Sequence, residues 1–316
     1  MPSQVDFYKG HMGGNRILLL DGEQMDRKHL LSQALRALDE VCLAGHQAAV
    51  LYKPERGGTV RARIASVCGR DFIGACGGFT QVIGRALVET PLGEIFPPEK
   101  RDGQLHITVE FDSLDVDVTV NLTDGKFDHV ATDFTAFARN LLLRGFERVN
   151  LGNLHAWRAG HFLVMNAQQV QEKHPDVNFE TMDGATTQLI TLLQYRFLGA
   201  TALTSWDFSL YDFETDGHGD ARVVFPHNVR IGFIEPSCGT GSIALALTLL
   251  ANGDHRQVGT REEDTHTFAF QTGGKPVMGG PDLTTVRIEH PQDDEIGPVT
   301  FSNTNVELLA SGRVSL

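Results

Sequence analysis

Apolar and polar positions along the chain predict many short strands and few helices, in an order that occurs twice. Alternation of apolar and polar residues over 106–120 is typical of a hairpin, and the apolar spacing over 30–41 is typical of an amphipathic helix. Strand-rich segments outnumber crossover helices in each half, which favours a duplicated α+β lobe over a doubly wound sheet. The pattern also predicts strands at 17–21, 48–52, 60–67, 71–74, 149–157, 205–213, 222–225, 286–289, 299–301 and 306–309, and helices at 134–143 and 188–197.

Each half carries one apolar helical stretch that begins with a Cys-Gly pair and further small residues. The first phrase contains Cys76 and the second contains Cys238, 162 residues later (238 − 76). A helix N-terminus carries unpaired N–H groups and partial positive charge, which favour a thiolate and can hold a carboxylate. We therefore expect two thiols that serve the same bound acid.

Composition restricts the classes of partner. The 316 residues are 41% hydrophobic and 21% charged, with a formal net charge of −13. An acidic chain argues against nucleic acid or an anionic membrane as the main partner, because both reward clustered Lys and Arg. The sequence shows neither a signal peptide nor an apolar run of about 18 residues. The acidic balance is compatible with a small-molecule ligand but does not identify one.

The four cysteines indicate free thiols rather than a scaffold. Cys42 and Cys68 fit small buried hydrophobes, and no CxxC or Cys/His cluster suggests a metal site. This usage is typical of the reducing cytoplasm, which is the expected location, with no metal bound.

Two thiols at helix starts suit the inversion of a carbon that carries a hydrogen. Inversion removes a proton from one face and returns another to the opposite face, so two bases avoid any swing of the substrate. Backbone N–H groups at both helix starts would stabilise the charge that develops on the acid. A thiol suits the role because its ordinary pKa, about 8.5, falls at such a position. The rival reading, a nucleophilic cysteine with a histidine base, accounts for only one of the two phrases.

Four motifs occur in an order that is similar to a known family. They are Lys9-Gly10-His11-Met12-Gly13-Gly14-Asn15, Cys76-Gly77, Gly152-Asn153-Leu154-His155 and Cys238-Gly239-Thr240-Gly241. On these motifs the chain resembles the diaminopimelate epimerase family of cofactor-independent amino-acid epimerases and racemases.

The resemblance spans nearly the whole chain and implies a fold. It implies two pseudo-symmetric lobes, each a strand-rich sheet around a central helix, with the active site in the cleft between them. The composition turns polar near 121–133, where we place the boundary. The expected N-terminal lobe is then 1–121, joined by the returning strands at 302–316, and the C-terminal lobe is 122–301. The resemblance also implies a homodimer and no cofactor.

The same resemblance assigns roles to individual residues. Cys76 and Cys238 become the acid/base pair, and Asn15 and Asn153 bind polar groups of the substrate. His155 either orients Asn153 or is a core histidine bound by backbone. Backbone N–H groups for the carboxylate come from Gly77, Gly78, Gly239 and Thr240.

Departures from the family pattern bear on the substrate. Phe79 stands where the family has a small residue, so its ring is expected to reshape the pocket, and Ser66 is the nearest match to an asparagine that grips the distal end of diaminopimelate. A Glu-Arg pair of the family aligns with Val229-Arg230, while Glu235 lies closer to the second cysteine. A further family asparagine maps either to Asn178 or to the strand that holds Asp207. Gln47 completes the set of candidate binding residues.

A site that lacks these distal partners loses affinity for diaminopimelate. We therefore predict an amino-acid racemase or epimerase that acts on another amino acid, with a cationic side chain such as histidine, arginine, lysine or ornithine suggested by the acidic balance and Asp207. The alternatives left open are diaminopimelate epimerase itself, a proline-racemase-like isomerase and a non-catalytic amino-acid-binding module.

Overall fold

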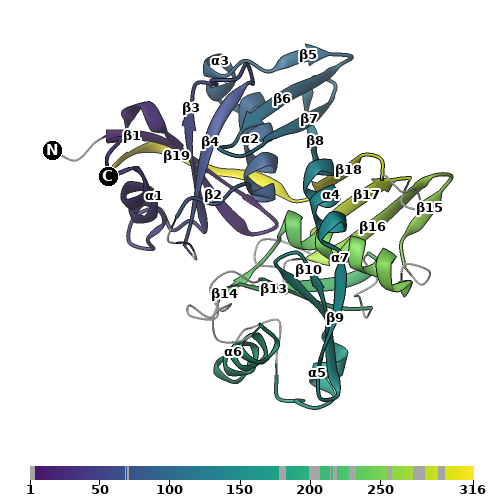
Figure 1. Cartoon of the computed structure of the whole chain (residues 1–316). Helices are drawn as coiled ribbons and strands as arrows, with labels where there is room; N and C mark the ends of the chain where they lie inside the picture. The colour runs from purple at the N-terminus through teal and green to yellow at the C-terminus, as the bar shows by residue number, and fades with distance from the viewer. Residues whose placement is uncertain are drawn as a thin grey trace. The chain divides into compact units, whose positions relative to one another are not determined.

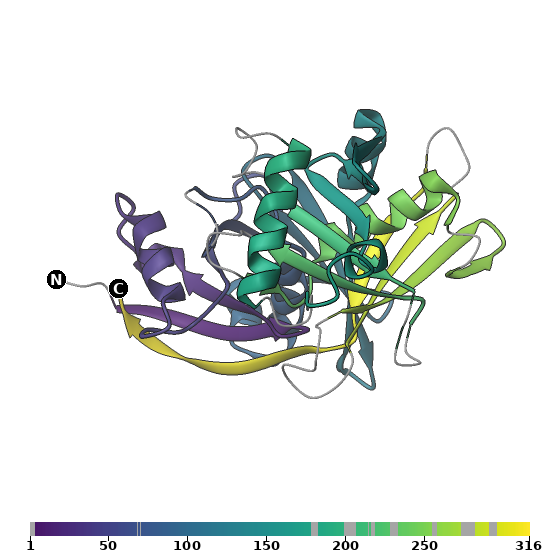
Figure 2. The same cartoon turned by 90° about the horizontal axis from the view of Figure 1, so that it is seen from below.

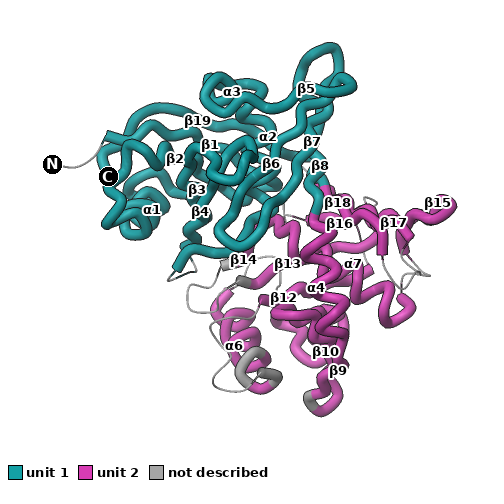
Figure 3. Tube along the Cα trace, turned by 45° about the horizontal axis from the view of Figure 1, so that its top comes forward, with its two compact units in different colours: residues 1–133, 302–316 teal, residues 134–301 magenta. Residues whose placement is uncertain are grey.

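The computed structural model describes residues 4–67, 69, 71–177, 183–198, 207–213, 215, 219–227, 233–254, 258–272, 282–290 and 296–316. The chain divides into two compact units, residues 1–133 with 302–316 and residues 134–301 (Figure 3).

Unit 1 is a sheet-rich body whose central helix is α2 (Figure 1). Helix α2 packs on strands that lie far apart in the sequence, among them β1, β7, β8 and β19. Its elements are β1 (Gln4–Met12), β2 (Asn15–Asp21), η1 (Gly22–Gln24), α1 (Leu30–Leu38), β3 (Gln47–Tyr52), β4 (Val60–Ser66), α2 (Gly77–Glu89), α3 (Leu92–Ile95), β5 (Glu99–Arg101), β6 (Gln104–Glu110), β7 (Asp115–Thr123), β8 (Lys126–Asp133) and β19 (Val306–Ser315).

Unit 2 has the same character, with α7 as its central helix. Helix α7 packs on β10, β11, β12 and β17, and α4 lies against it. Its elements are α4 (Thr135–Arg144), β9 (Phe146–Leu151), β10 (Leu154–Ala159), β11 (Phe162–Asn166), α5 (Gln168–Gln171), α6 (Gly184–Leu198), β12 (Asp207–Asp212), β13 (Ala221–His227), β14 (Phe233–Glu235), α7 (Gly239–Asn252), β15 (Thr260–Glu262), β16 (Thr265–Thr272), β17 (Asp282–Glu289) and β18 (Val299–Asn303), of which the last ends in unit 1.

The strands of the two units pair in the same sequence of directions. In unit 1, β1–β2 is antiparallel, β2–β3 parallel, β3–β4 antiparallel and β4–β6 parallel. In unit 2, β10–β11, β11–β12, β12–β13 and β13–β16 repeat that order. The expected α+β fold of two similar lobes, each around a central helix, is confirmed.

Both central helices are buried almost all round, which explains their sequences. Most residues of α2 and α7 are apolar or small, and Gly84 allows α2 to approach the sheet, since a Cβ there would lie 2.8 Å from Val130 Cγ2. A helix that is apolar on every face is stable only when other elements enclose it. The strands supply that enclosure in each unit.

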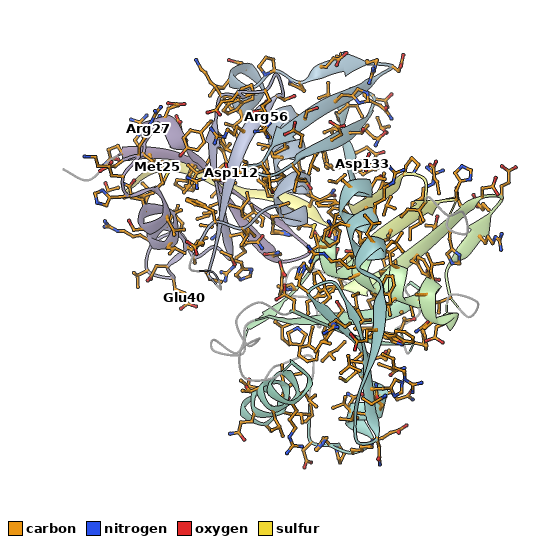
Figure 4. All side chains as sticks on the ribbon, in the orientation of Figure 1. Met25, Arg27, Glu40, Arg56, Asp112 and Asp133 are labelled. Atoms are coloured by element: carbon orange, nitrogen blue, oxygen red, sulfur yellow. The ribbon has the colours of Figure 1, made fainter. Side chains whose placement is uncertain are left out.

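The C-terminal strand belongs to unit 1, where β19 runs antiparallel to β1 (Figures 1 and 2). The unit boundary near the middle of the chain lies at 133/134, twelve residues after the boundary predicted at 121/122. Strand β8 lies between these two points and pairs with β7, which keeps it in unit 1. Asp133, labelled in Figure 4, is the last residue before the chain enters unit 2.

Local structure differs from the sequence expectations at several places, of which three are informative. The strand expected over 149–157 is a hairpin of β9 and β10, because Gly152 adopts a positive φ of 59° in the turn between them. Residues 71–74 form only an isolated bridge, Ile64 to Ile73. Strand β16 was not expected, although its apolar and polar residues alternate.

One buried carboxylate holds a loop of unit 1 in place. Glu110, at the end of β6, accepts backbone N–H bonds from Glu55, Arg56 and Gly58 at 2.6–2.8 Å. Arg56, labelled in Figure 4, donates in turn to the carbonyl oxygen of Phe111 at 2.6 Å. The carboxylate thus satisfies donors that the loop between β3 and β4 would otherwise bury unpaired.

None of the helices in the described part of the chain is long and apolar enough to cross a membrane.

Candidate active site

Cys76 is the N-cap residue of α2. Its backbone is extended (φ −147°, ψ 119°), its side chain is 5% exposed, and its sulfur accepts the Phe79 N–H at 3.3 Å. An acceptor at the N-cap satisfies one of the free N–H groups of the first turn. The helix start therefore favours negative charge on this sulfur.

Two polar side chains from adjacent strands lie at this helix start. Cys76 Sγ lies 2.6 Å from Gln47 Oε1, as donor to the amide oxygen. Ser66 pairs with Gln47 across β3 and β4, so both side chains stand on one face of the sheet. Both residues are about nine-tenths buried. The structure thus brings together Cys76 with two of the residues that the sequence suggested.

Asn15, the first residue of β2, also lies near the start of α2. A Cβ built on Gly78 would lie 3.5 Å from Asn15 Nδ2 and 3.3 Å from Ile17 Cδ1. Gly77 and Gly78 are the first two residues of α2 and are buried. Glycine at 78 therefore leaves the backbone N–H groups and the Asn15 amide close together.

Cys238 takes the matching position as the N-cap of α7. Its backbone is also extended (φ −134°, ψ 111°), its side chain is 8% exposed, and its sulfur lies 3.5 Å from Thr240 Oγ1. Ser209 on β12 donates its hydroxyl to the carbonyl oxygen of Gly241 at 3.3 Å. The second thiol thus also stands at the start of a buried central helix.

Aromatic rings leave space only for glycine at two positions of this second helix start. A Cβ on Gly239 would lie 2.7 Å from Phe301 Cζ, and one on Gly241 would lie 2.6 Å from Phe225 Cε1. The Phe301 ring is held in turn by Phe134, with ring centroids 5.6 Å apart. Rigid rings at such distances leave no space for a side chain.

Strand register shows which turn of unit 2 corresponds to the Gly13-Gly14 turn of unit 1. Met12 pairs with Asn15 around that turn, and Ala159 pairs with Phe162 around Gly160-His161. The next strand enters in parallel in both units, with Ile17 opposite Gln47 and Val164 opposite Ser209. The equivalent turn is therefore Gly160-His161.

By this register, Asn153 and His155 do not lie at the end of the unit 2 sheet where α7 begins. Asn153 lies in the opposite turn of β10, four residues from Trp157, which shares the row of Ser209; four residues of strand span about 13 Å.

His155 lies near Asp254, just after the C-terminal end of α7. Burial and the cations Arg148 and Lys173 lower the His155 pKa, while Asp254 acts in the opposite direction. A helix of this length separates its two ends by about 20 Å. The backbone of His155 makes two hydrogen bonds with the Gln169 side chain, which fits a structural role for this segment.

His161 is a candidate that sequence reasoning missed. Its Nε2 lies 3.9 Å from Asp207 Oδ2, and its ring packs on Phe162 with centroids 4.2 Å apart. Asp207 lies two residues before Ser209 and on the same face of β12. Both polar groups therefore stand at the end of the sheet where α7 begins. A Gly-His turn directly before an apolar strand, like the Gly-Gly turn of unit 1, was the available indication.

The remaining expected residues divide into three groups. The Phe79 ring is fully buried in the core against Phe111, so it does not reshape a pocket as expected; only its backbone N–H faces the thiol. Glu235 is buried on β14, three residues before Cys238. Asn178 and Arg230 lie outside the described residues. Within the described ranges, no three His, Cys, Asp or Glu residues are grouped so as to hold a metal ion.

No family model matches the sequence, and no curated protein matches it. Solved structures do. A hydroxyproline epimerase from Agrobacterium vitis, with bound trans-4-hydroxy-L-proline, is 13% identical with a TM-score of 0.65, over 99% of this chain and 92% of that chain. The chain shares this fold. A phenazine biosynthesis protein of the PhzF family from Bacillus anthracis is 12% identical, with a TM-score of 0.62 over the whole of both chains. A methylitaconate-delta-isomerase is 13% identical, with a TM-score of 0.59 over 99% of this chain and 95% of that chain.

These likenesses correct the expected family at the finer level. The chain shares the fold of solved proteins named as a hydroxyproline epimerase and a methylitaconate-delta-isomerase, and neither is a diaminopimelate epimerase.

Proposed function

We propose that this protein is a cofactor-independent isomerase that inverts an amino acid at Cα, with Cys76 and Cys238 as its acid/base pair. The observation that carries the proposal is the repeated helix start. Each unit has a buried central helix whose N-cap is a cysteine and whose first residue is glycine. The shared fold with proteins named as an epimerase and an isomerase supports the same class of reaction.

The chemistry needs one thiolate and one thiol. The thiolate takes the Cα proton from one face, and the thiol gives its proton to the opposite face, so the two exchange roles when the direction reverses. The Phe79 N–H stabilises negative charge on Cys76 by a charge-assisted bond. The Gln47 amide can accept from the thiol or, turned over, donate to the thiolate, so it serves both states.

The carbanion or enolate needs positive partners for its carboxylate. We assign this role to the backbone N–H groups at the two helix starts, from Gly77, Gly78, Gly239 and Thr240. Fixed dipoles at a helix N-terminus stabilise developing negative charge without rearrangement during the reaction. The glycines among them keep side chains out of the way.

The polar groups of each unit suggest what holds the rest of the substrate. Asn15, Gln47 and Ser66 offer uncharged donors and acceptors at the first helix start. Asp207 offers a carboxylate at the second, beside His161. We assign the substrate amine to Asp207, and a cationic side chain such as that of histidine, arginine, lysine or ornithine to the same acidic environment.

A cyclic amino acid is the second candidate substrate. The hydroxyproline epimerase of the same fold was solved with trans-4-hydroxy-L-proline. A secondary amine would meet Asp207 as a primary amine does, so this candidate keeps the same two thiols and the same chemistry.

Solvent deuterium exchange tests the proposal. The protein is incubated in deuterated buffer with a panel of L-amino acids that includes proline, trans-4-hydroxy-L-proline and LL-diaminopimelate, and Cα exchange is followed by NMR. We expect exchange with inversion, without added pyridoxal phosphate, for at least one member. Exchange that requires added pyridoxal phosphate, or none at all across the panel, would contradict the proposal.

Thiol chemistry separates the isomerase from a non-catalytic binding module. Activated thiols should react with iodoacetamide below the ordinary thiol pKa of about 8.5 and be protected by the exchanging amino acid. A short bifunctional thiol reagent should join Cys76 to Cys238. The homodimer stays a prediction, which light scattering checks.

A further inference from the structure

Three buried polar side chains form a chain of hydrogen bonds that ends at the start of α2. Thr80 and Gln81 lie near the start of this helix and Thr132 lies on β8, and all three are fully buried. Thr80 Oγ1 lies 2.7 Å from the carbonyl oxygen of Gly77 and 2.9 Å from Thr132 Oγ1. Gln81 Nε2 lies 2.9 Å from Thr132 Oγ1, and Gln81 Oε1 lies 3.2 Å from the backbone nitrogen of Asn303. These contacts connect Asn303 to the first residue of α2.

The two ends of this chain fix the direction of every bond in it. The backbone N–H of Asn303 can only donate, so it requires the amide oxygen of Gln81 and leaves the amide NH₂ group toward Thr132. The carbonyl oxygen of Gly77 can only accept, so it takes the single hydroxyl proton of Thr80. Thr80 must then accept from Thr132, which in turn accepts from Gln81. All donors therefore point the same way, from Asn303 toward Gly77.

The last acceptor belongs to the peptide group that also carries the Gly78 N–H. A trans peptide is planar and its C=O and N–H point in opposite directions, so a held oxygen also sets the direction of the N–H. This peptide joins two glycines, whose backbone dihedral angles are the least restrained of all residues. Hydrogen bonds in series also polarise one another, which makes the N–H of the accepting peptide a stronger donor.

The Gly78 N–H is well placed to use this support. Gly78 is the second residue of α2, and the first N–H groups of a helix have no partner within the helix. The next N–H, of Phe79, donates to the sulfur of Cys76. We propose that Thr80, Thr132 and Gln81 are positioning residues that aim the Gly78 N–H at the substrate carboxylate and strengthen it as a donor.

The inference rests on the proposed function for the identity of that carboxylate. The state of the Gly77–Gly78 peptide, in contrast, can be read without any substrate. The failure of one idea therefore does not hide the fate of the other.

An HNCO NMR spectrum of the isotope-labelled protein gives the Gly77 carbonyl carbon and the Gly78 N–H in one signal. We expect Thr80→Val to move the carbonyl carbon to lower frequency, because the oxygen loses a hydrogen bond, and Thr132→Val to move it the same way by less. Thr80→Ser and Thr132→Ser keep the hydroxyl groups and should leave the signal near its parent position. A signal that does not respond to Thr132→Val would overturn the proposal.

Kinetics then separate positioning from mere structure. For the amino acid that exchanges fastest, we expect kcat/KM to fall about tenfold in Thr80→Val and about threefold in Thr132→Val, and less than about twofold in the two serine variants. Thr248→Val is the matched control, because Thr248 is equally buried in α7 and donates to the carbonyl oxygen of Ala244 at 2.7 Å. It should lower the thermal midpoint as Thr80→Val does and leave kcat/KM near the parent value. Losses of kcat/KM that merely follow the thermal midpoint, Thr248→Val included, would overturn the positioning role.

A double-mutant cycle completes the test. In a Thr80→Val background, Thr132→Val should lower kcat/KM hardly further, because the bond that connects it to Gly77 is already gone. Additive effects would show that Thr132 does not act through Thr80. If no amino acid of the panel exchanges, the proposed function fails, and the HNCO signal decides whether the chain of bonds controls this peptide.

Discussion

The two central helices begin alike, but the strands around them offer different chemistry. On the sheet of unit 1, the face toward α2 carries the polar residues Asn15, Gln47 and Ser66, with Ile17 opposite Gln47. By the same register, the equivalent positions of unit 2 are Phe162, Ser209 and Phe225, two of them aromatic, with Val164 opposite Ser209. The repeated topology thus keeps the cysteine and its glycine while the neighbouring side chains differ.

The difference indicates a division of labour. A thiol and backbone N–H groups serve any amino acid, because every amino acid has an α-carbon and a carboxylate. Selection among amino acids needs side chains that hydrogen-bond to specific groups. We infer that unit 1 supplies most of these groups, while unit 2 adds Asp207 and His161.

Removing either thiol should have the largest effect. We expect Cys76→Ala and Cys238→Ala each to lower kcat for inversion by about a thousandfold or more, because each face of Cα loses its only proton carrier. Chiral chromatography of product measures this loss. Cys42→Ala, against the hydrophobic cluster around α1 in unit 1, is the matched control and should retain activity. Full inversion by either active-site variant would end the two-base mechanism.

Glycine replacements should separate the two helix starts next. Gly239→Ala and Gly241→Ala meet rigid rings, so we expect each to lower the free energy of unfolding by about 1–3 kcal/mol. Gly78→Ala meets the far end of Ile17 at 3.3 Å and should cost less stability, while its methyl group impairs binding. Thermal unfolding and KM measure the contrast. Equal loss of stability at all three would contradict it.

The polar residues of unit 1 that face α2 should contribute more to kcat/KM than the residues at the equivalent positions of unit 2. We expect Gln47→Ala to lower kcat/KM about tenfold, since it removes a hydrogen-bond partner of the Cys76 sulfur. Ser209→Ala removes a bond to a helix carbonyl and should change kcat/KM less than threefold. Steady-state exchange kinetics give both values. A larger effect at Ser209 would reverse the division of labour.

Acid should loosen unit 1 at a defined place. Burial alone raises the pKa of Glu110, but N–H bonds from Glu55, Gly58 and Arg56 outweigh it and hold the pKa below its ordinary value. The contribution of this carboxylate to stability is present above the unfolded pKa, about 4.3, and is lost as the pH falls through the folded value.

Hydrogen exchange at those three amides reads this small effect. We expect protection to fall below about pH 4 in the parent protein, and Glu110→Gln to show reduced protection already at pH 7. Asp112→Asn, on a more exposed carboxylate that pairs with Arg61 and Arg63, is the control and should leave these amides unchanged. Unchanged protection in Glu110→Gln would contradict the role of the carboxylate.

The sequence alone predicts the fold and the two helix starts because both depend on local patterns. A cysteine and glycines before an apolar helical run mark Cys76 and Cys238 directly. Ser66 also lies within the strand predicted at 60–67, and Gln47 lies directly before the strand predicted at 48–52.

The errors occur where pairing between distant segments decides the outcome. Strand β10 has a glycine turn at each end, Gly152-Asn153 and Gly160-His161, and only the register with β11 and β12 shows which end lies at the start of α7. Thr132 likewise meets Thr80 through the packing of β8 on α2, which no local pattern reveals.

The pairing of β19 with β1 has a consequence for biosynthesis. Unit 1 lacks this strand until the ribosome has translated all of unit 2, because β19 follows unit 2 in the chain. During synthesis of unit 2, the edge of β1 that later pairs with β19 is exposed and could pair with strands of other chains. Unit 1 becomes complete only after unit 2 has been translated, when β19 pairs with β1.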